Sequence, residues 1–122
     1  MQVLSSATAE LTAEYGIRIG RWSQYPGSDR LPFKAMWCEI APGSSSSPDR
    51  HPEVELAVVV NGDATFAVEG VDVPAPLGTA VLFSSEEGHV IHNNSAELPL
   101  VILSVYWLPE DAPKGEETRD ER

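Results

Sequence analysis

The sequence predicts an all-β protein, either a sandwich or a barrel. Seven or eight short stretches alternate or concentrate apolar residues, as half-buried strands do. Turn-forming Gly, Pro, Asn, Asp and Ser residues separate these stretches at intervals of about 8–12 residues, and almost no segment has a helical pattern. The chain has 122 residues, 42% of them hydrophobic and 22% charged, which is typical of one globular domain.

The first third of the chain predicts a short extension followed by two strands. Residues 7–14 have a weak helical tendency, and residues 15–22 form a strand with Ile17 and Ile19 on one face. Pro, Gly and Asp make residues 23–32 a loop, and residues 33–41 form the next strand. We expect the large aromatic side chains and the single cysteine to be buried in the core: Phe33, Trp37, Cys38 and Phe83.

The remaining strands are separated by clear turn signals. Strands over 55–61 and 64–68 flank Asn61-Gly62-Asp63, which has the residue types of a tight hairpin turn. The prolines at positions 74 and 76 place any strand at 71–73 on a sheet edge. Strands over 79–83, 89–93 and 98–107 complete a single domain over residues 1–108. Residues 109–122 have no apolar periodicity and predict a disordered acidic tail.

The charge and the cysteine count exclude several classes of function. The net charge of −11 predicts no binding to nucleic acid or to anionic membranes, because both would repel the surface. No apolar run approaches the roughly 20 residues that span a bilayer, and the start of the chain does not have the pattern of a signal peptide. A single cysteine, Cys38, permits no internal disulfide, so we expect a cytoplasmic protein.

Two blocks of the sequence carry all three histidines, each next to a short apolar strand. In the first block Gly43 is followed by Asp49, His51, Glu55 and Gly62; in the second, Gly78 is followed by His89 and Asn93. With this spacing the chain resembles the cupins, small jelly-roll barrels also described as a double-stranded β-helix. Asp49 stands where the first cupin histidine is usual, and Ser84 and Glu86 replace a proline and a glycine of the second motif. The short spacer between the blocks is typical of compact bacterial cupins.

The resemblance implies a divalent metal ion inside the barrel. Carried over position by position, its ligands are Asp49, His51, Glu55 and His89. Two imidazoles with carboxylates suit Zn(II), Fe(II), Mn(II), Ni(II) or Co(II). Asp49 is the departure from the family pattern, because it leaves two imidazoles where three are usual. A barrel that has lost its metal is therefore an open alternative, and Asp49 could instead form a turn or lie on the surface.

Side chains alternate between the two faces of a strand, and this alternation indicates which other residues could be metal ligands. Asp49 and His51 can share a face, whereas His92 takes the face opposite to that of His89 and Asn93. By strict alternation Glu53 competes with Glu55 as a ligand. Further alternatives are an ion pair between Glu55 and Arg50, and a role for Glu86 in supporting a ligand histidine rather than lying in solvent.

The expected function is that of a metal-dependent enzyme acting on a small organic molecule. The alternative is a non-catalytic barrel that binds a metal or metabolite as a sensor or accessory subunit. A third hypothesis rests on the ending Val105-Tyr106-Trp107-Leu108-Pro109 together with the four candidate ligands. These look similar to cupin domains that accompany methionyl-tRNA-synthetase-like proteins and join two amino acids through an N–N bond. We also expect a homodimer, with the outward-facing residues Leu56, Val58 and Val60 as candidates for its interface.

Overall fold

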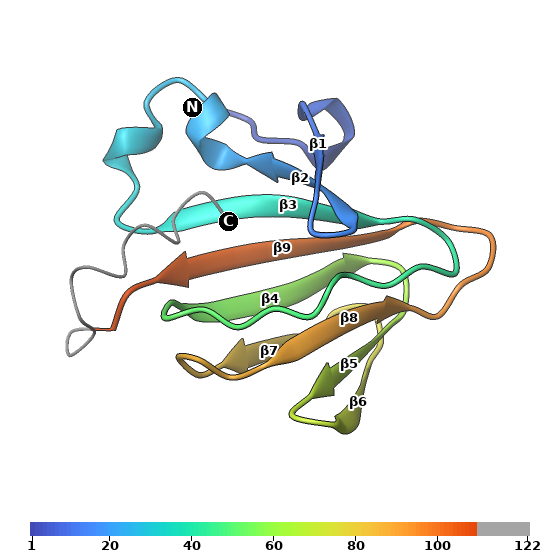
Figure 1. The fold of residues 1–122 in the computed structure, drawn as a ribbon. Coiled ribbons are helices and arrows are strands. Elements are labelled where there is room, and N and C mark those ends of the chain that lie inside the picture. The colour runs from blue at the N-terminus through green and yellow to red at the C-terminus, as the bar shows by residue number, and fades with distance from the viewer. Residues whose placement is uncertain (110–122) are drawn as a thin grey trace.

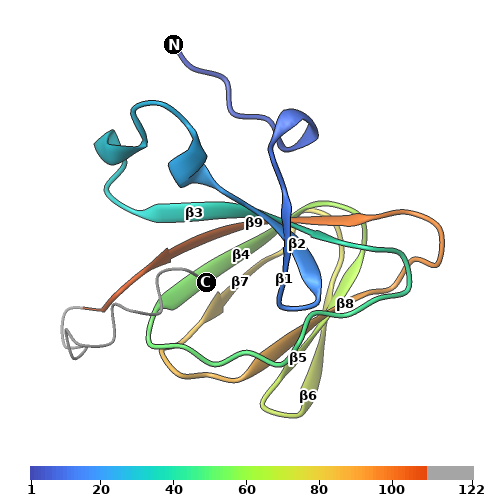
Figure 2. The ribbon, with the colours of Figure 1, turned by 45° about the horizontal axis from the view of Figure 1, so that its top comes forward.

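The computed structural model describes residues 1–109, and in this part of the chain strands dominate and helices are single turns. A six-stranded antiparallel sheet has the order β1-β2-β3-β9-β4-β7 and a three-stranded one has the order β6-β5-β8 (Figures 1 and 2). The large sheet contains β1 (Thr12–Glu14), β2 (Ile17–Arg21), β3 (Lys34–Ile40), β4 (Val54–Asn61), β7 (Ala80–Phe83) and β9 (Leu100–Trp107). The small sheet contains β5 (Ala64–Val68), β6 (Val71–Ala75) and β8 (His89–Asn93). The 3-10 turns are η1 (Ser6–Thr8), η2 (Trp22–Gln24) and η3 (Ser28–Arg30). The predicted all-β architecture is confirmed.

The core lies between the two sheets and follows the alternation of the strands. In β4 the buried positions alternate with half-buried ones, and Leu56 and Val58 face outward as predicted. Phe66 of the small sheet packs against Phe83 of the large sheet, with ring centroids 5.7 Å apart, and both are fully buried. Near the start of β4 this apolar interior gives way to buried histidine and glutamate side chains, which form the candidate site.

Two hairpins are closed by two-residue turns that the sequence analysis did not identify. Tyr15 and Gly16 join β1 to β2, and Glu69 and Gly70 join β5 to β6. All four residues have positive φ, between 49° and 80°. Two consecutive positive φ angles are the signature of a type I′ turn, whose twist matches that of paired strands. The β6 strand lies at the sheet edge, as its prolines predict.

The prediction of a hairpin at Asn61-Gly62-Asp63 is wrong. A turn does occur there, with Gly62 at φ 99°, but β4 pairs with β7 and β9, whereas β5 pairs with β6 and β8. The turn therefore carries the chain from one sheet to the other. Glycine suits position 62 because φ is 99° there and a Cβ atom would lie only 3.2 Å from the Cα atom of Leu100. Residue types alone do not distinguish a hairpin from a crossing between sheets.

The expectations for the first third of the chain need two corrections. Residues 7–14 were predicted to have a weak helical tendency, but the only helical turn near them is η1 (Ser6–Thr8). Residues 12–14 instead form strand β1 of the large sheet. A segment this short gains more from pairing with a neighbouring strand than from an isolated helix. Trp37 is half-buried on the outer face, where it packs against Trp22 and donates a 2.9 Å hydrogen bond to Tyr25 Oη.

The other core assignments divide between the interior and the surface. Phe83 and Cys38 are buried as predicted, whereas Phe33 is half-buried and lines a surface pocket. No helix within residues 1–109 is long and apolar enough to cross a membrane. Apart from Pro109, the predicted tail lies outside the described residues.

Candidate metal centre

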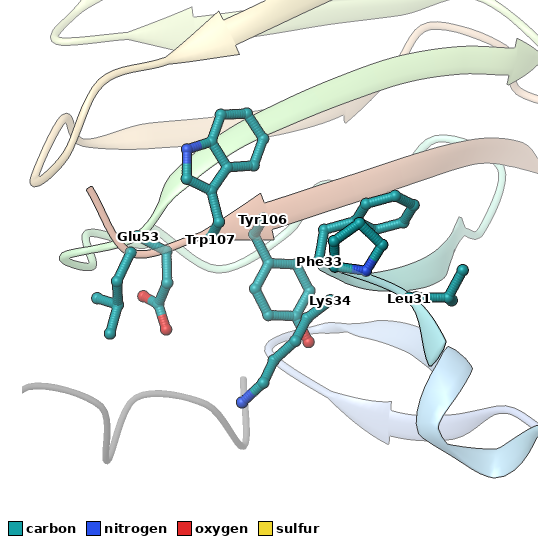
Figure 3. A pocket seen from close by; sticks show the side chains of 8 residues that line it. Leu31, Phe33, Lys34, Glu53, Tyr106 and Trp107 are labelled. Atoms are coloured by element: carbon teal, nitrogen blue, oxygen red, sulfur yellow. The ribbon is translucent and has the colours of Figure 1, made fainter. Parts of the chain in front are cut away.

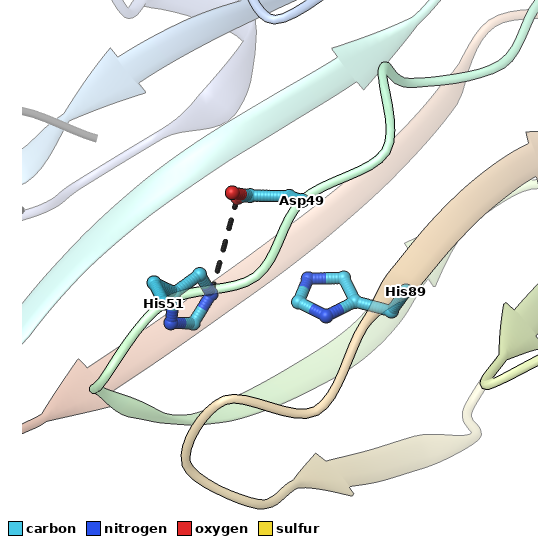
Figure 4. Close-up of side chains that lie close together, drawn as sticks. All are labelled: Asp49, His51 and His89. Atoms are coloured by element: carbon cyan, nitrogen blue, oxygen red, sulfur yellow. Dashed lines mark ion pairs between the residues drawn. The ribbon is translucent and has the colours of Figure 1, made fainter.

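The Ser-rich segment before β4 places Asp49 beside His89. This segment runs antiparallel to β8, with bridges between Ser45 and His92 and between Asp49 and His89. At the second bridge the backbones exchange hydrogen bonds of 3.1 and 3.0 Å. The Asp49 side chain is 12% exposed, so the aspartate lies at the edge of the buried cluster and not in open solvent (Figure 4).

His51 is buried and held by the backbone. Its Nδ1 atom lies 3.1 Å from the carbonyl oxygen of Glu53, and because a carbonyl can only accept, Nδ1 carries the proton. The other nitrogen, Nε2, forms a hydrogen bond with Glu55 Oε1, and a metal ion bound at Nε2 would take the place of the shared proton. Nε2 lies 3.0 Å from Glu55 Oε1 and 3.9 Å from Asp49 Oδ2.

His89 repeats this arrangement from the other sheet. Its Nδ1 atom donates to the carbonyl oxygen of Glu87 at 3.0 Å, and its Nε2 atom lies 3.6 Å from Glu55 Oε1. The ring stacks on Phe83, with centroids 4.1 Å apart and planes inclined by 12°. The two imidazoles are thus fixed in position, and both direct Nε2 toward the same carboxylate oxygen.

Glu55 joins the two histidines and is 1% exposed. It lies on β4 opposite Tyr106 of β9 and Phe83 of β7, so strands on both sides fix its backbone. Its second oxygen, Oε2, accepts a 2.6 Å hydrogen bond from Ser104 Oγ. The sequence analysis missed Ser104, although one signal was present: it is a serine at an inward-facing position of β9, between the buried Ile102 and Tyr106.

The four carried-over residues lie together. Asp49, His51 and His89 each offer a ligand atom within 4.8 Å of the others, and Glu55 contacts both imidazoles. With neutral imidazoles and ionised carboxylates the group has a formal charge of −2, which matches a divalent cation. Glu55 already forms hydrogen bonds with Ser104 and His51, and a divalent cation would offset the remaining negative charge. The residue types and their positions therefore fit a divalent metal ion.

The competing residues lie outside this cluster. Glu53 precedes β4 in a bend after Pro52, so the strict alternation that would align it with Glu55 does not apply. Its carboxylate lies on the Nδ1 side of His51, opposite the side that faces Glu55. His92 faces away, as predicted, and its Nδ1 atom contacts Ser45 Oγ at 2.5 Å.

Two further motif residues have structural contacts. Asn93 donates from Nδ2 to the carbonyl oxygens of Ile40, Ala41 and Leu98 at 2.8–3.2 Å, so it links β8 to the end of β3 and to the segment before β9. Glu86 is exposed with φ 62°, and its backbone N–H donates to the His51 carbonyl at 2.7 Å. A glutamate thus adopts a left-handed conformation that glycine favours, at a turn that holds the backbone of His51.

An ion pair covers the outer side of the site. Arg50 is exposed, lies 3.3 Å from Glu69 and donates to the Glu86 carbonyl. The Gly88 backbone N–H, with the Arg50 charge, holds the pKa of Glu69 below its ordinary value. These contacts link the β5–β6 turn to the loops that carry His51 and His89.

Two spaces of different size adjoin the cluster. Asp49 and His89 border a narrow space of about 20 Å³, walled mainly by apolar residues of β2 and β3. They also border a shallow outer depression of about 440 Å³ between Pro48 and Val90. The inner space is the size of about one water molecule, whereas the depression on the outer side has room for a larger ligand.

Comparisons with known proteins identify the architecture. The family model described as "Cupin domain" matches residues 36–106, more than half of the chain. A Cupin 2 conserved barrel domain protein from Salinispora arenicola superposes with a TM-score of 0.77 at 25% identity, over 98% of this chain and 94% of that one. A search of curated proteins found no match.

Two other solved structures share the fold at lower identity. A predicted oxalate decarboxylase from Thermotoga maritima has a TM-score of 0.73 at 21% identity, over 88% of this chain and all of that one. The cupin domain of an XRE family transcriptional regulator from Enterobacter cloacae has a TM-score of 0.61 at 23% identity, over 78% of this chain and 99% of that one. At these identities the likeness concerns the fold alone.

Proposed function

The chain belongs to the cupin family, and on that premise we propose that it is a metal-dependent enzyme acting on a small organic molecule. His51, His89 and Glu55 hold a divalent ion, with Asp49 as a fourth ligand. The ion supplies Lewis acidity or an acidified bound water when present. The residues of the chain supply its position and a surrounding from which bulk water is largely excluded.

The observation that carries the proposal is the orientation of the two imidazoles. Each Nδ1–H is donated to a backbone carbonyl, at 3.1 Å for His51 and 3.0 Å for His89. Each Nε2 atom then faces the same oxygen of Glu55, at 3.0 and 3.6 Å. Histidines that bind metal are commonly oriented in this way, with the second nitrogen donating to a carbonyl or carboxylate.

Metal analysis tests the proposal. Protein purified without added metal and then incubated with Zn(II), Fe(II), Mn(II), Co(II) or Ni(II) should retain about one ion per chain. His51→Ala and His89→Ala should each lower the metal content sharply, because each removes an imidazole ligand. His92→Ala is the matched control and should leave the metal content unchanged. Absence of bound metal under all five conditions, or loss of metal in His92→Ala, would contradict the proposal.

The alternative function is a non-catalytic metal-binding barrel, and the narrow inner space of about 20 Å³ favours it. A catalytic ion needs an open coordination position, whereas a structural ion is closed by protein ligands. Water-proton relaxation of the Mn(II)-loaded protein distinguishes the two. An exchangeable bound water supports the enzyme, and its absence supports the binding module.

A further inference from the structure

A separate pocket contains Glu53, whose carboxylate lies on the Nδ1 side of His51, away from the Nε2 atom that faces the candidate metal centre. It has a volume of about 290 Å³ and is lined by the start of β3, the end of β9 and Glu53. Figure 3 shows the Glu53 carboxylate toward one end of the pocket, the Tyr106 ring next to it, and Leu31 at the far end. The metal-centre hypothesis does not use this pocket.

Glu53 is the unusual member of the lining. Its residue is 1% exposed, yet neither carboxylate oxygen has a hydrogen-bond partner among the described residues. His51 Nδ1 lies 3.4 Å from Glu53 Oε1, but its hydrogen is donated to the backbone carbonyl of Glu53 at 3.1 Å. A buried carboxylate without donors is costly in free energy, and native structures seldom keep one without a function.

The rest of the lining fits the hydrocarbon part of a small cation. Leu31, Phe33, Trp107 and Leu108 contribute apolar surface, and Tyr106 contributes a ring that is 2% exposed. Aromatic faces attract ammonium groups, and the attraction increases where water is excluded. Lys34 also lines the pocket and is exposed. The ammonium group is therefore expected at the Glu53 end of the pocket, where the carboxylate lies.

We propose that this pocket binds a small organic ammonium ion, with Glu53 as its counter-ion and the aromatic and aliphatic residues around its carbon chain. The ammonium N–H groups supply donors to the Glu53 oxygens, which have no hydrogen-bond partner within residues 1–109. The proposal does not depend on the metal, because Glu53 lies on the Nδ1 side of His51 and the candidate metal ligands lie on its Nε2 side.

The test uses n-butylammonium chloride as the probe and n-butanol as a neutral molecule of the same length. Backbone amide signals are followed by NMR in the full-length protein at constant ionic strength. Butylammonium should shift the signals of Phe33, Glu53 and Tyr106 and saturate in the millimolar range. Butanol should bind at least about tenfold more weakly, since it cannot form the charged hydrogen bonds.

Two variants of equal charge change locate the binding. Glu53→Gln should weaken butylammonium binding by about tenfold or more, because it removes the counter-ion but keeps the shape. Asp72→Asn on β6, which is exposed and outside this pocket, should have no effect. Glu53→Gln is expected to fold normally, because it removes a buried charge without breaking a hydrogen bond of that carboxylate to a described residue.

The results that overturn the proposal are specific. They are absence of butylammonium binding to the unaltered protein, equal binding of butanol, or undiminished binding by Glu53→Gln. His89→Ala separates this site from the metal centre: it should lose metal and still bind butylammonium. If a folded His89→Ala variant loses butylammonium binding as well, the two sites are one and the inference fails.

Discussion

Replacing Ser104 with alanine should weaken both the fold and the metal centre. The Ser104 hydroxyl donates a 2.6 Å hydrogen bond to Glu55 Oε2, and both residues are at most 1% exposed. A hydrogen bond to a charged group contributes about 1.5–3 kcal/mol, and burial prevents water from replacing the lost donor. We therefore expect a loss of about 2 kcal/mol in the free energy of unfolding of the metal-free protein.

The same substitution should affect metal binding, because Ser104 orients a proposed ligand. Loss of such a supporting hydrogen bond commonly lowers metal affinity by about 10–100-fold. Urea denaturation measures the first effect, and competition with a chelator of known affinity measures the second. Ser45→Ala is the matched control: Ser45 is exposed, and its hydroxyl contacts His92, so its loss should cost less than about 0.5 kcal/mol. A Ser104→Ala variant as stable as the control, with unchanged metal affinity, would refute the reasoning.

Three further predictions concern the fold and the outer rim. Phe66→Ala should lower the free energy of unfolding by about 3–5 kcal/mol in urea denaturation, since the side chain is fully buried between the sheets; a loss below 1 kcal/mol would contradict this core. Gly70→Ala should lower the free energy of unfolding by roughly 1 kcal/mol, because φ is 80° at this position, although no atom lies close enough to clash. An unchanged midpoint of urea denaturation would contradict the left-handed conformation of Gly70 in the β5–β6 turn. NMR titration should give Glu69 a pKa below the ordinary glutamate value of about 4.3. The contacts of its ionised carboxylate with Gly88 and Arg50 therefore stabilise the fold fully above that ordinary value. This stabilisation is lost as the pH falls through the lower pKa of the folded protein. A Glu69 titration midpoint at the ordinary glutamate value would contradict these contacts.

The resemblance to the cupins predicted which residues meet across the barrel, whereas strand alternation predicted only which face each side chain takes. His51, Glu55 and His89 face one another as the motif spacing implies, and His92 faces away. Alternation could not decide between Glu53 and Glu55. The decision depends on where β4 begins, and the bend at Pro52 and Glu53 sets that start.

Contacts between distant segments were not predictable. Ser104 lies 49 residues from Glu55 and meets it only because β9 pairs with β4. Trp37 was assigned to the core from its size, but the inward face of β3 is occupied by Met36 and Cys38. Which face of a strand is buried depends on the sheet that packs against it, and the local pattern of β3 allowed either face.

The central claim is that His51 and His89 bind a divalent ion through Nε2. Long-range proton–nitrogen NMR of the histidine side chains, recorded before and after addition of one equivalent of Zn(II), measures this directly. We predict that the Nε2 resonances of both residues shift, that both Nδ1 atoms stay protonated, and that His92 is unaffected. Unchanged resonances of His51 and His89, shifts at their Nδ1 atoms, or a response of His92 in their place would contradict the claim.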